Sequence, residues 1–342
     1  MRPVALTATT ALRSQGRRGF SSTARRLDTY AFIGLGQMGY EMARNLQSKL
    51  SPTDTIRLYD INPSAAERLT NEMTTNHAGG AKPSIATSAA EAAHDATTIL
   101  TCLPEPAHVL ATYTSILSSP LPPLPVSRLL IDHSTIDPST SRRVAALAAP
   151  ADATFIDAPM SGGVIGAAAG TLTFMVGCPA TAPLLAARLA PVLGKMGARV
   201  LPCGPQGAGL AAKLANNYLL AVQNVAVCEA MRLGVASGLD ARVLAGVINS
   251  STGRCWASEV NNPVPRVVEG APAGRGYKGG FGIGLMRKDL ALARVAAAEV
   301  GVGLVLGERV GEVYEEAEGR EGGGDFSVVY KWLEGRDGGK GE

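Results

Sequence analysis

The sequence contains few of the residues that build disulfide frameworks or zinc sites. Five cysteines and four histidines are scattered along 342 residues, with no C-x-x-C pair and no spacing typical of metal ligands. The pattern therefore predicts neither disulfides nor a bound metal. Any redox chemistry would need an organic cofactor.

Long hydrophobic runs are also missing. Glycine, asparagine or charged residues interrupt the longest apolar runs well short of a bilayer span, so we expect a soluble protein with no membrane partner. Because 46% of its residues are hydrophobic and 18% are charged, the chain can form one large or two ordinary domains with proper cores.

The first 27 residues contain no acidic residue, and the first one is Asp28. This segment has six arginines, many small or hydroxylated residues and no continuous apolar core, which is typical of a mitochondrial transit peptide. A disordered basic tail is the alternative. Removing the six arginines from the 32 basic residues leaves 26 against 29 acidic ones, so the formal charge changes from +3 to −3. A mature matrix protein of this charge gives no reason to expect a nucleic-acid partner.

From Thr29 onward, short strand-like runs alternate with helical ones. Repeated strand–helix units predict an α/β fold with a doubly wound parallel sheet. The proline-rich residues 118–126 are expected to form a surface loop. Strands are expected at residues 29–36, 55–60, 96–104 and 128–135.

Beyond Gly197 the strand signals fade, and helices are expected from Gln206 to about Glu318. Residues 206–236 are long enough for one helix of about 45 Å, at about 1.5 Å per residue. Their scarcity of charge predicts burial nearly all round, by other helices or by a second subunit. The glycine-rich residues 318–326 are expected to form a flexible turn. The predicted divisions are a transit peptide (1–27), a doubly wound α/β domain (28–203), a helical domain (204–335) and a disordered tail (336–342).

A glycine motif follows the first expected strand and opens the first expected helix. It has the pattern G-x-G-x-x-G, whose glycines permit a tight turn, close approach to a pyrophosphate and close helix packing. The helix N-terminus supplies free N–H groups and a positive dipole end. The candidate cofactor residues here are Gly34, Leu35, Gly36, Gln37, Met38 and Gly39.

Asp60 ends the second expected strand, 21 residues after Gly39. A carboxylate there can accept hydrogen bonds from both ribose hydroxyls and would repel a 2′-phosphate. No arginine follows immediately, so the sequence favours NAD over NADP. The alternative is a glycine-rich turn and a capping aspartate that bind no ligand.

Two later strands end in residues suited to the cofactor crevice. Leu103-Pro104 leaves one strand, and Ser134-Thr135 leaves the next with hydroxyls that can bond ribose or nicotinamide. Position alone leaves ordinary strand exits with helix caps equally open. Ser161-Gly162-Gly163 offers a hydroxyl and unobstructed backbone N–H groups, which could cradle a carboxylate or form a plain flexible turn.

Lys213 is the only charged residue between Arg199 and Glu229. It lies four residues before Asn217 and therefore shares a helix face with it. An ammonium beside a carboxamide can hold a small hydroxy acid, and desolvation would lower the pKa of the lysine and help it exchange a proton. The alternative is a lysine that extends to solvent or pairs with a carboxylate elsewhere.

These motifs resemble the β-hydroxyacid dehydrogenase family over residues 30–333, nearly the whole mature chain. The run G-R-C-W followed by N-P-V-P is similar to its 3-hydroxyisobutyrate branch. The other matching stretches are FIGLGQMG, LPEPAHV, IDHSTIDP, DAPMSGGVIGAAAGTLTFMVG, GPQGAGLAAKLANN and FGIGLMRKDLALA.

The resemblance implies roles for individual residues. Lys213 matches the catalytic lysine, Asn217 an asparagine that holds substrate, and residues 161–163 the loop for the substrate carboxylate. It also implies that residues 28–203 form an N-terminal NAD-binding Rossmann domain. The long helix joins it to an all-helical C-terminal domain (204–335) for substrate binding and oligomerisation, in a homodimer or homotetramer. Positions that match cofactor contacts are Leu103, Pro104, His108, Thr135 and Lys288.

The implied activity is NAD-dependent oxidation of 3-hydroxyisobutyrate to methylmalonate semialdehyde in valine breakdown. One alternative is an enzyme for another small β-hydroxy acid, such as a tartronate semialdehyde reductase. Others are a non-catalytic dinucleotide-binding scaffold and an NADP-linked imine reductase. Asp60 disfavours the imine reductase, because its carboxylate would repel the 2′-phosphate of NADP. Three positions depart from the family pattern and concern substrate fit: His133, where a small polar residue is usual, Asn261 for tyrosine and Arg266 for glycine.

Overall fold

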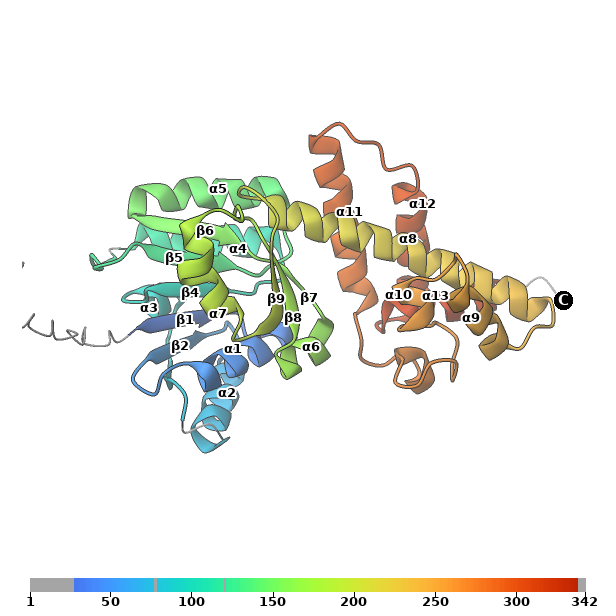
Figure 1. Cartoon of the computed structure of the whole chain (residues 1–342), viewed down its shortest axis with the longest axis horizontal. Coiled ribbons are helices and arrows are strands. Elements are labelled where there is room, and N and C mark those ends of the chain that lie inside the picture. Colours follow the sequence, from blue (N-terminus) through green and yellow to red (C-terminus); the bar gives the residue numbers. More distant parts are fainter. Residues whose placement is uncertain (1–27, 77–78, 120, 338–342) are drawn as a thin grey trace, which may run out of the picture.

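The computed structural model describes residues 28–76, 79–119 and 121–337. The expected transit peptide lies outside the described residues. The described chain forms an α/β part and a helical part, and one long helix, α8 (Ala208–Ala236), runs from the first into the second (Figure 1).

The α/β part is built on a six-stranded sheet in which every neighbouring pair is parallel. Its order is β3-β2-β1-β4-β5-β6, so the direction of winding reverses between β1 and β4. This confirms the predicted doubly wound sheet. The strands are β1 (Thr29–Ile33), β2 (Thr55–Tyr59), β3 (Lys82–Ile85), β4 (Thr98–Thr101), β5 (Arg128–Asp132) and β6 (Ala153–Asp157).

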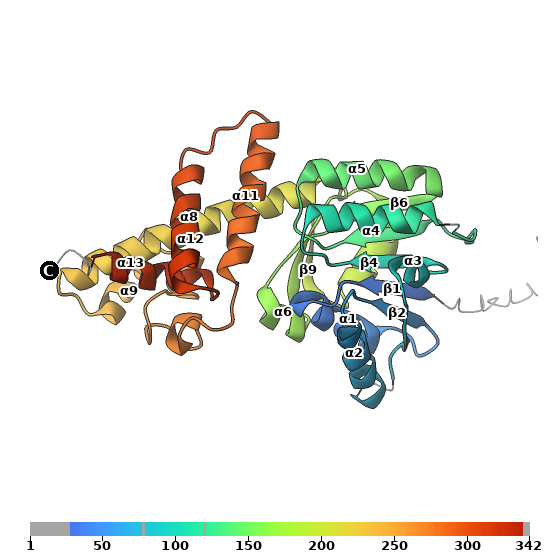
Figure 2. The ribbon, with the colours of Figure 1, turned by 180° about the vertical axis from the view of Figure 1, so that it is seen from behind.

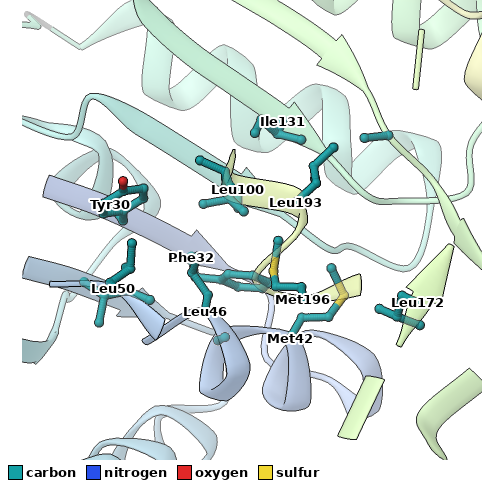
Figure 3. Packing of buried hydrophobic residues seen from close by; sticks show 14 of the residues in the cluster. Tyr30, Phe32, Met42, Leu46, Leu50, Leu100, Ile131, Leu172, Leu193 and Met196 are labelled. Atoms are coloured by element: carbon teal, nitrogen blue, oxygen red, sulfur yellow. The ribbon is translucent and has the colours of Figure 1, made fainter. Parts of the chain in front are cut away.

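Helices cover both faces of this sheet, because successive residues of each strand point to opposite sides. Tyr30 and Phe32 enter one core cluster with α1 and α2, whereas Ala31 and Ile33 enter another with α3, α4 and α5. Figure 2 shows α4 and α5 on their face, and Figure 3 shows Phe32 against Met42. These helices are α1 (Gln37–Lys49), α2 (Pro63–Asn76), α3 (Ala89–Ala93), α4 (Pro106–Ser118) and α5 (Pro138–Ala148).

A second, three-stranded sheet follows the first. Its strands β7 (Met160–Ser161) and β8 (Leu172–Val176) are antiparallel, whereas β8 and β9 (Gly197–Pro202) are parallel. The expectation that strands fade near Gly197 was therefore wrong. Most side chains of β9 are exposed, so this strand lacks the alternating pattern that marks a half-buried one. Between the strands lie α6 (Gly163–Ala169), a π-helical turn (Leu185–Leu189) and α7 (Ala190–Leu193).

Helix α8 confirms the expected long helix but not its burial nearly all round. Leu210 lies in the core of the sheet, and Cys228 and Met231 lie in the core of the helical part, which accounts for its apolar character. By length and composition, α8 also passes as a possible membrane span. One face of it is exposed in the single chain: Ala211, Ala215, Leu219, Ala226, Ala230 and Leu233.

The helical part packs around the second half of α8, as the sequence predicted. The expected turn at residues 318–326 starts later than expected, because α12 continues to Glu321, and α13 reaches two residues into the expected tail. Arg266 has a φ of 66°, in the region that favours glycine. The helices are α9 (Ala241–Ser250), α10 (Trp256–Glu259), α11 (Ile283–Glu299), α12 (Gly307–Glu321) and α13 (Val329–Asp337).

The start of α8 is held by a buried carboxylate at the end of β6. Asp157 accepts hydrogen bonds from the backbone N–H groups of Gly207 (2.7 Å) and Leu210 (3.0 Å). A Cβ at Gly177 would lie 1.9 Å from Asp157 Oδ1, so glycine there leaves the room that the carboxylate needs. Burial raises the pKa of Asp157, and these backbone donors oppose the rise. Asp157 therefore fixes α8 to the sheet three residues before Lys213.

We expect Asp157→Ala to lower the free energy of unfolding by about 2–3 kcal/mol, because buried N–H groups at the helix start lose a charged acceptor. Asp240→Ala is the matched control: Asp240 caps α9 through the N–H groups of Arg242 and Val243, but at an exposed site. It should cost no more than about 1 kcal/mol. Urea denaturation of both variants measures the difference, and equal losses would contradict the special role of Asp157.

Candidate active site

The carboxyl ends of the parallel strands form one edge of the main sheet, where β1 meets β4. In doubly wound folds, this switch point is where ligands bind. The glycine motif leaves β1 here, with Gly34 at a φ of 92° and Gly36 as the N-cap of α1. Among the described residues no side chain caps this helix, so its first backbone N–H groups remain available for an anion.

The three glycines differ in what surrounds them. At Gly34, an added Cβ would lie 2.3 Å from the backbone oxygen of Cys102. At Gly39, an added Cβ would lie 2.0 Å from the backbone oxygen of Gly34. These two glycines are therefore needed for the local packing of the chain. At Gly36, by contrast, a Cβ would meet no atom of the described residues within 4 Å. The open space at Gly36 and the free amides of α1 fit the pyrophosphate of a dinucleotide.

Asp60 follows β2 and lies beside the glycine loop. Its Oδ2 accepts a hydrogen bond from the backbone N–H of Leu35 (2.5 Å), and its Oδ1 accepts one from that of Asn62 (2.8 Å). The two bonds fix the carboxylate at the sheet edge where the sequence predicted a ribose-binding group.

A buried hydrogen-bond network supports the loops after β4 and β5. The hydroxyl of Ser134 accepts from the N–H of Leu103 (2.8 Å) and donates to Asp132 Oδ1 (2.6 Å), which also accepts from Thr101 (2.7 Å). Burial raises the pKa of Asp132 to about 6, against the lowering effect of these hydrogen bonds. Ser134 thus joins the two loops. His108, which the resemblance assigned to the cofactor, is exposed in the first turn of α4.

His133 is fully buried between β5 and the loop that leads to Ser161. Its Nδ1 is 2.8 Å from the backbone oxygen of Ala158, and its ring packs near that of Phe174. Burial lowers the pKa of His133 to about 4, so the neutral imidazole donates its Nδ1–H to Ala158. The imidazole of His133, at a position where the family pattern has a small polar residue, therefore contacts the start of the loop that leads to Ser161.

The predicted substrate loop lies at the turn from β7 to α6. Ser161 pairs with Thr173 on β8, and β8 packs against α8. Gly162 and Gly163 have φ values of 136° and 62°, in the region that favours glycine, and both are exposed. The glycines therefore allow a turn whose backbone amides are not covered by side chains.

Lys213 is buried in the second turn of α8, with 8% of its surface exposed. Within the described part of the chain, its amine makes no hydrogen bond. Burial lowers the pKa of Lys213, the charge of Lys288 lowers it further, and the carboxylate of Asp289 acts in the opposite direction. With its pKa lowered, Lys213 loses its proton at a lower pH than an exposed lysine does.

Asn217 lies one turn after Lys213 and is also buried. Its amide nitrogen donates to Asp289 Oδ2 (2.6 Å), and its oxygen accepts from the amide of Asn216 (3.1 Å). A carboxylate only accepts hydrogen bonds, so Asp289 fixes which end of the carboxamide is the nitrogen. Within the part of the chain that the structure describes, the second N–H of Asn217 has no acceptor and can donate to a ligand.

Lys288 brings α11 to the cofactor edge of the sheet. Its amine donates to the backbone oxygens of Pro104 and Thr135, each at 3.0 Å. The structure therefore places together Leu103, Pro104, Thr135 and Lys288, which the resemblance assigned to cofactor contacts. It adds Asp289, which the sequence analysis missed and which the structure connects to Asn217 and Lys288. Among the residues of known placement, no cluster of His, Cys, Asp or Glu could hold a metal ion.

Comparisons with known proteins agree with this geometry. Residues 29–204 match a family model described as the NAD-binding domain of 6-phosphogluconate dehydrogenase. Residues 207–333 match one described as NAD-binding of NADP-dependent 3-hydroxyisobutyrate dehydrogenase. A probable mitochondrial 3-hydroxyisobutyrate dehydrogenase of Dictyostelium discoideum is 43% identical over 89% of this chain and 90% of its own length. The chain belongs to the 3-hydroxyisobutyrate dehydrogenase family.

Other members of the 3-hydroxyisobutyrate dehydrogenase family match over a similar span. The mitochondrial enzyme of Homo sapiens is 40% identical over 88% of this chain and 85% of its own. A solved structure of the Mycobacterium tuberculosis enzyme with L-serine has a TM-score of 0.80 and 39% identity, and covers 90% of this chain and 99% of that one. The protein is thus an oxidoreductase with nicotinamide dinucleotide-binding domains.

Two glycine substitutions should separate folding from cofactor binding. Gly36→Ala adds a methyl group into open space at an ordinary φ of −63° and should leave the melting temperature nearly unchanged. Because that space fits a pyrophosphate, dinucleotide affinity should fall by about tenfold or more, or about 1.4 kcal/mol. Gly39→Ala should instead cost about 1–3 kcal/mol of stability through overpacking.

Calorimetric titration with NAD and thermal melts measure both effects. Unchanged NAD affinity in Gly36→Ala would contradict the assignment of the pyrophosphate to this loop.

Proposed function

We propose that the protein oxidises 3-hydroxyisobutyrate to methylmalonate semialdehyde with NAD, and that Lys213 exchanges the proton. The observation that carries this proposal is the buried amine of Lys213, which has a lowered pKa and lies one turn from Asn217. The names of the relatives supply the substrate, since they are 3-hydroxyisobutyrate dehydrogenases. The chain keeps the amine that a catalytically silent dinucleotide-binding scaffold would not need.

The residues at the sheet edge fit a dinucleotide. The open space at Gly36 and the uncapped start of α1 suit the pyrophosphate, while Asp60 is fixed where a ribose would lie. The loops at Leu103-Pro104 and Thr135 would line the nicotinamide end, with His108 nearby. When bound, the nicotinamide supplies a hydride acceptor.

The side chains of this chain then divide the remaining work. Ser161, Gly162 and Gly163 bind the carboxylate of the hydroxy acid through a hydroxyl and backbone N–H groups. Asn217 donates its remaining N–H to the alcohol oxygen and orients it. Lys213 takes the hydroxyl proton as the hydride leaves the carbinol carbon, so the alcohol becomes an aldehyde. The burial of Lys213 limits the access of bulk water to its amine.

Location and assembly are part of the same proposal. The acid-free, arginine-rich residues 1–27 and the mitochondrial names of the relatives support import into the matrix, where valine breakdown would use the activity. The exposed apolar face of α8, defined above, supports a homodimer or homotetramer through the helical part. The division into domains at 28–203 and 204–335 is retained with it.

We expect Lys213→Met to lower turnover by about 10²- to 10⁴-fold, because the proton acceptor is lost while the volume of the side chain is kept. NAD affinity should stay nearly intact in this variant, as in Lys213→Ala. In the wild type, oxidation should rise with pH as the amine loses its proton, and do so below the usual lysine range. Steady-state kinetics with 3-hydroxyisobutyrate, tartronate semialdehyde and related acids measure these effects.

Lys331→Met, at an exposed lysine of α13, is the control and should keep wild-type turnover. Wild-type turnover in Lys213→Met would instead contradict the role of Lys213. A clear preference for tartronate semialdehyde would replace the proposed substrate.

We expect Asp60→Ser to weaken NAD binding by about 10- to 100-fold, because a charged hydrogen-bond acceptor for the ribose is lost. NADP should be tolerated better, since the carboxylate no longer repels a 2′-phosphate. Asp54→Ser removes a carboxylate near the opposite end of β2 and should change neither cofactor. The ratio of kcat/KM for the two cofactors tests this, and a ratio that Asp60→Ser leaves unchanged would contradict the ribose contact.

A further inference from the structure

Helix α11 contacts the cofactor edge of the sheet through one side chain. The amine of Lys288 donates to the backbone oxygens of Pro104, after β4, and Thr135, after β5. It also lies 3.5 Å from Asp289 Oδ1. An ammonium has three N–H donors, and these three oxygens can take all of them. In this arrangement, Lys288 is a bridge between two parts of the protein and not a free cation.

The next residue continues the connection toward α8. Asp289 is 3% exposed, and its second oxygen accepts from the amide of Asn217 at 2.6 Å. Asn217 lies one turn after Lys213 on the same helix face. An unbroken chain of polar contacts therefore runs from the Pro104 and Thr135 loops through Lys288 and Asp289 to Asn217.

We propose that Lys288 and Asp289 form an interdomain latch, two positioning residues that align the loops at Pro104 and Thr135 with the amine of Lys213. The latch consists of these two side chains with the oxygens of Pro104 and Thr135 and the amide of Asn217. It rests on the proposed function, because it matters for turnover only if Lys213 exchanges the proton. Lys288 thereby acts through protein contacts, beyond any contact with the cofactor itself.

The latch also sets the charge around Lys213 from two sides. Lys288 lowers the pKa of Lys213 and Asp289 raises it, while burial gives the largest lowering. The loss of Lys288 should therefore raise the pKa of Lys213, and the loss of the Asp289 charge should lower it. A residue with a purely structural role would not shift the pH dependence of the reaction in a defined direction.

Neighbouring residues of α11 provide the experiment. Lys288→Met should lower kcat by about 10- to 100-fold, because small misplacements of reacting groups have effects of this size. Its pH profile should move to higher pH. Asp289→Asn should move the profile to lower pH, and Lys288→Arg, which keeps charge and donors, should recover most of kcat and the wild-type profile. Arg287→Met is the matched control, since Arg287 pairs with Glu315 and Glu318 on α12 and should change neither.

Thermal melts and NAD titrations accompany the kinetics of each variant. Opposite shifts of the two profiles, with NAD affinity changed less than kcat, support the latch. A Lys288→Met variant that loses only NAD affinity and keeps kcat and its profile would show a plain cofactor contact and overturn the latch. If Asp289→Asn fails to fold, Lys288→Met and Lys288→Arg still decide.

The two proposals fail in different ways. Activity in Lys213→Met overturns the proposed function and the latch with it. An inactive Lys213→Met together with unshifted profiles in the Lys288 and Asp289 variants overturns the latch alone.

Discussion

The burial of the Lys213 amine is the constraint on which the rest of the arrangement depends. A lysine that leaves water loses hydration, which hydrogen bonds or an opposite charge must replace. Here the described residues provide no hydrogen bond to the amine, and the nearby Asp289 only partly offsets the effect of burial. The desolvation that makes burial of this amine unfavourable for folding also lowers its pKa. The lowered pKa lets the amine accept a proton from a bound alcohol. A scaffold that keeps such a group must exclude water from it, so the helix that carries it cannot move freely.

Helix α8 meets this requirement because it belongs to two cores. Leu210 packs in the sheet core and Met231 in the helical core, while Asp157 binds the N–H groups of its first turn. Lys213 lies between these anchors, three residues after Leu210, where helix geometry leaves little freedom. Both parts of the protein therefore determine where the amine lies. The scarcity of charge along α8, first read as burial all round, is explained by these two cores and by one exposed apolar face.

The sequence predicted what depends on local pattern. Four strands (β1, β2, β4 and β5), the glycine loop before α1 and the long helix follow from short-range periodicity and turn residues. It missed β9, whose exposed side chains give no alternation. It also missed the contacts of Asp289 with Asn217 and of Lys288 with Pro104, which join residues 72 and 184 positions apart. Such pairings depend on how the two parts dock, and one sequence contains no local signal for them. The resemblance supplied Lys288 as a position, whereas the geometry supplied its partners.

The charges at the site bear on the order of binding and proton transfer. Lys213, Lys288 and Asp289 together carry a net positive charge when Lys213 is protonated, and none when it is neutral. An anionic hydroxy acid is therefore attracted most by the protonated form, yet oxidation needs the neutral amine. The bound carboxylate favours the ammonium and should hold the pKa of Lys213 higher in the complex than in the free enzyme. The pH dependence of kcat, which reports the complex, should then lie above that of kcat/KM, which reports the free enzyme. Asp289 raises the pKa of Lys213, as the substrate carboxylate should. A higher pKa favours binding of the anionic acid, whereas a lower pKa favours deprotonation of its hydroxyl by Lys213.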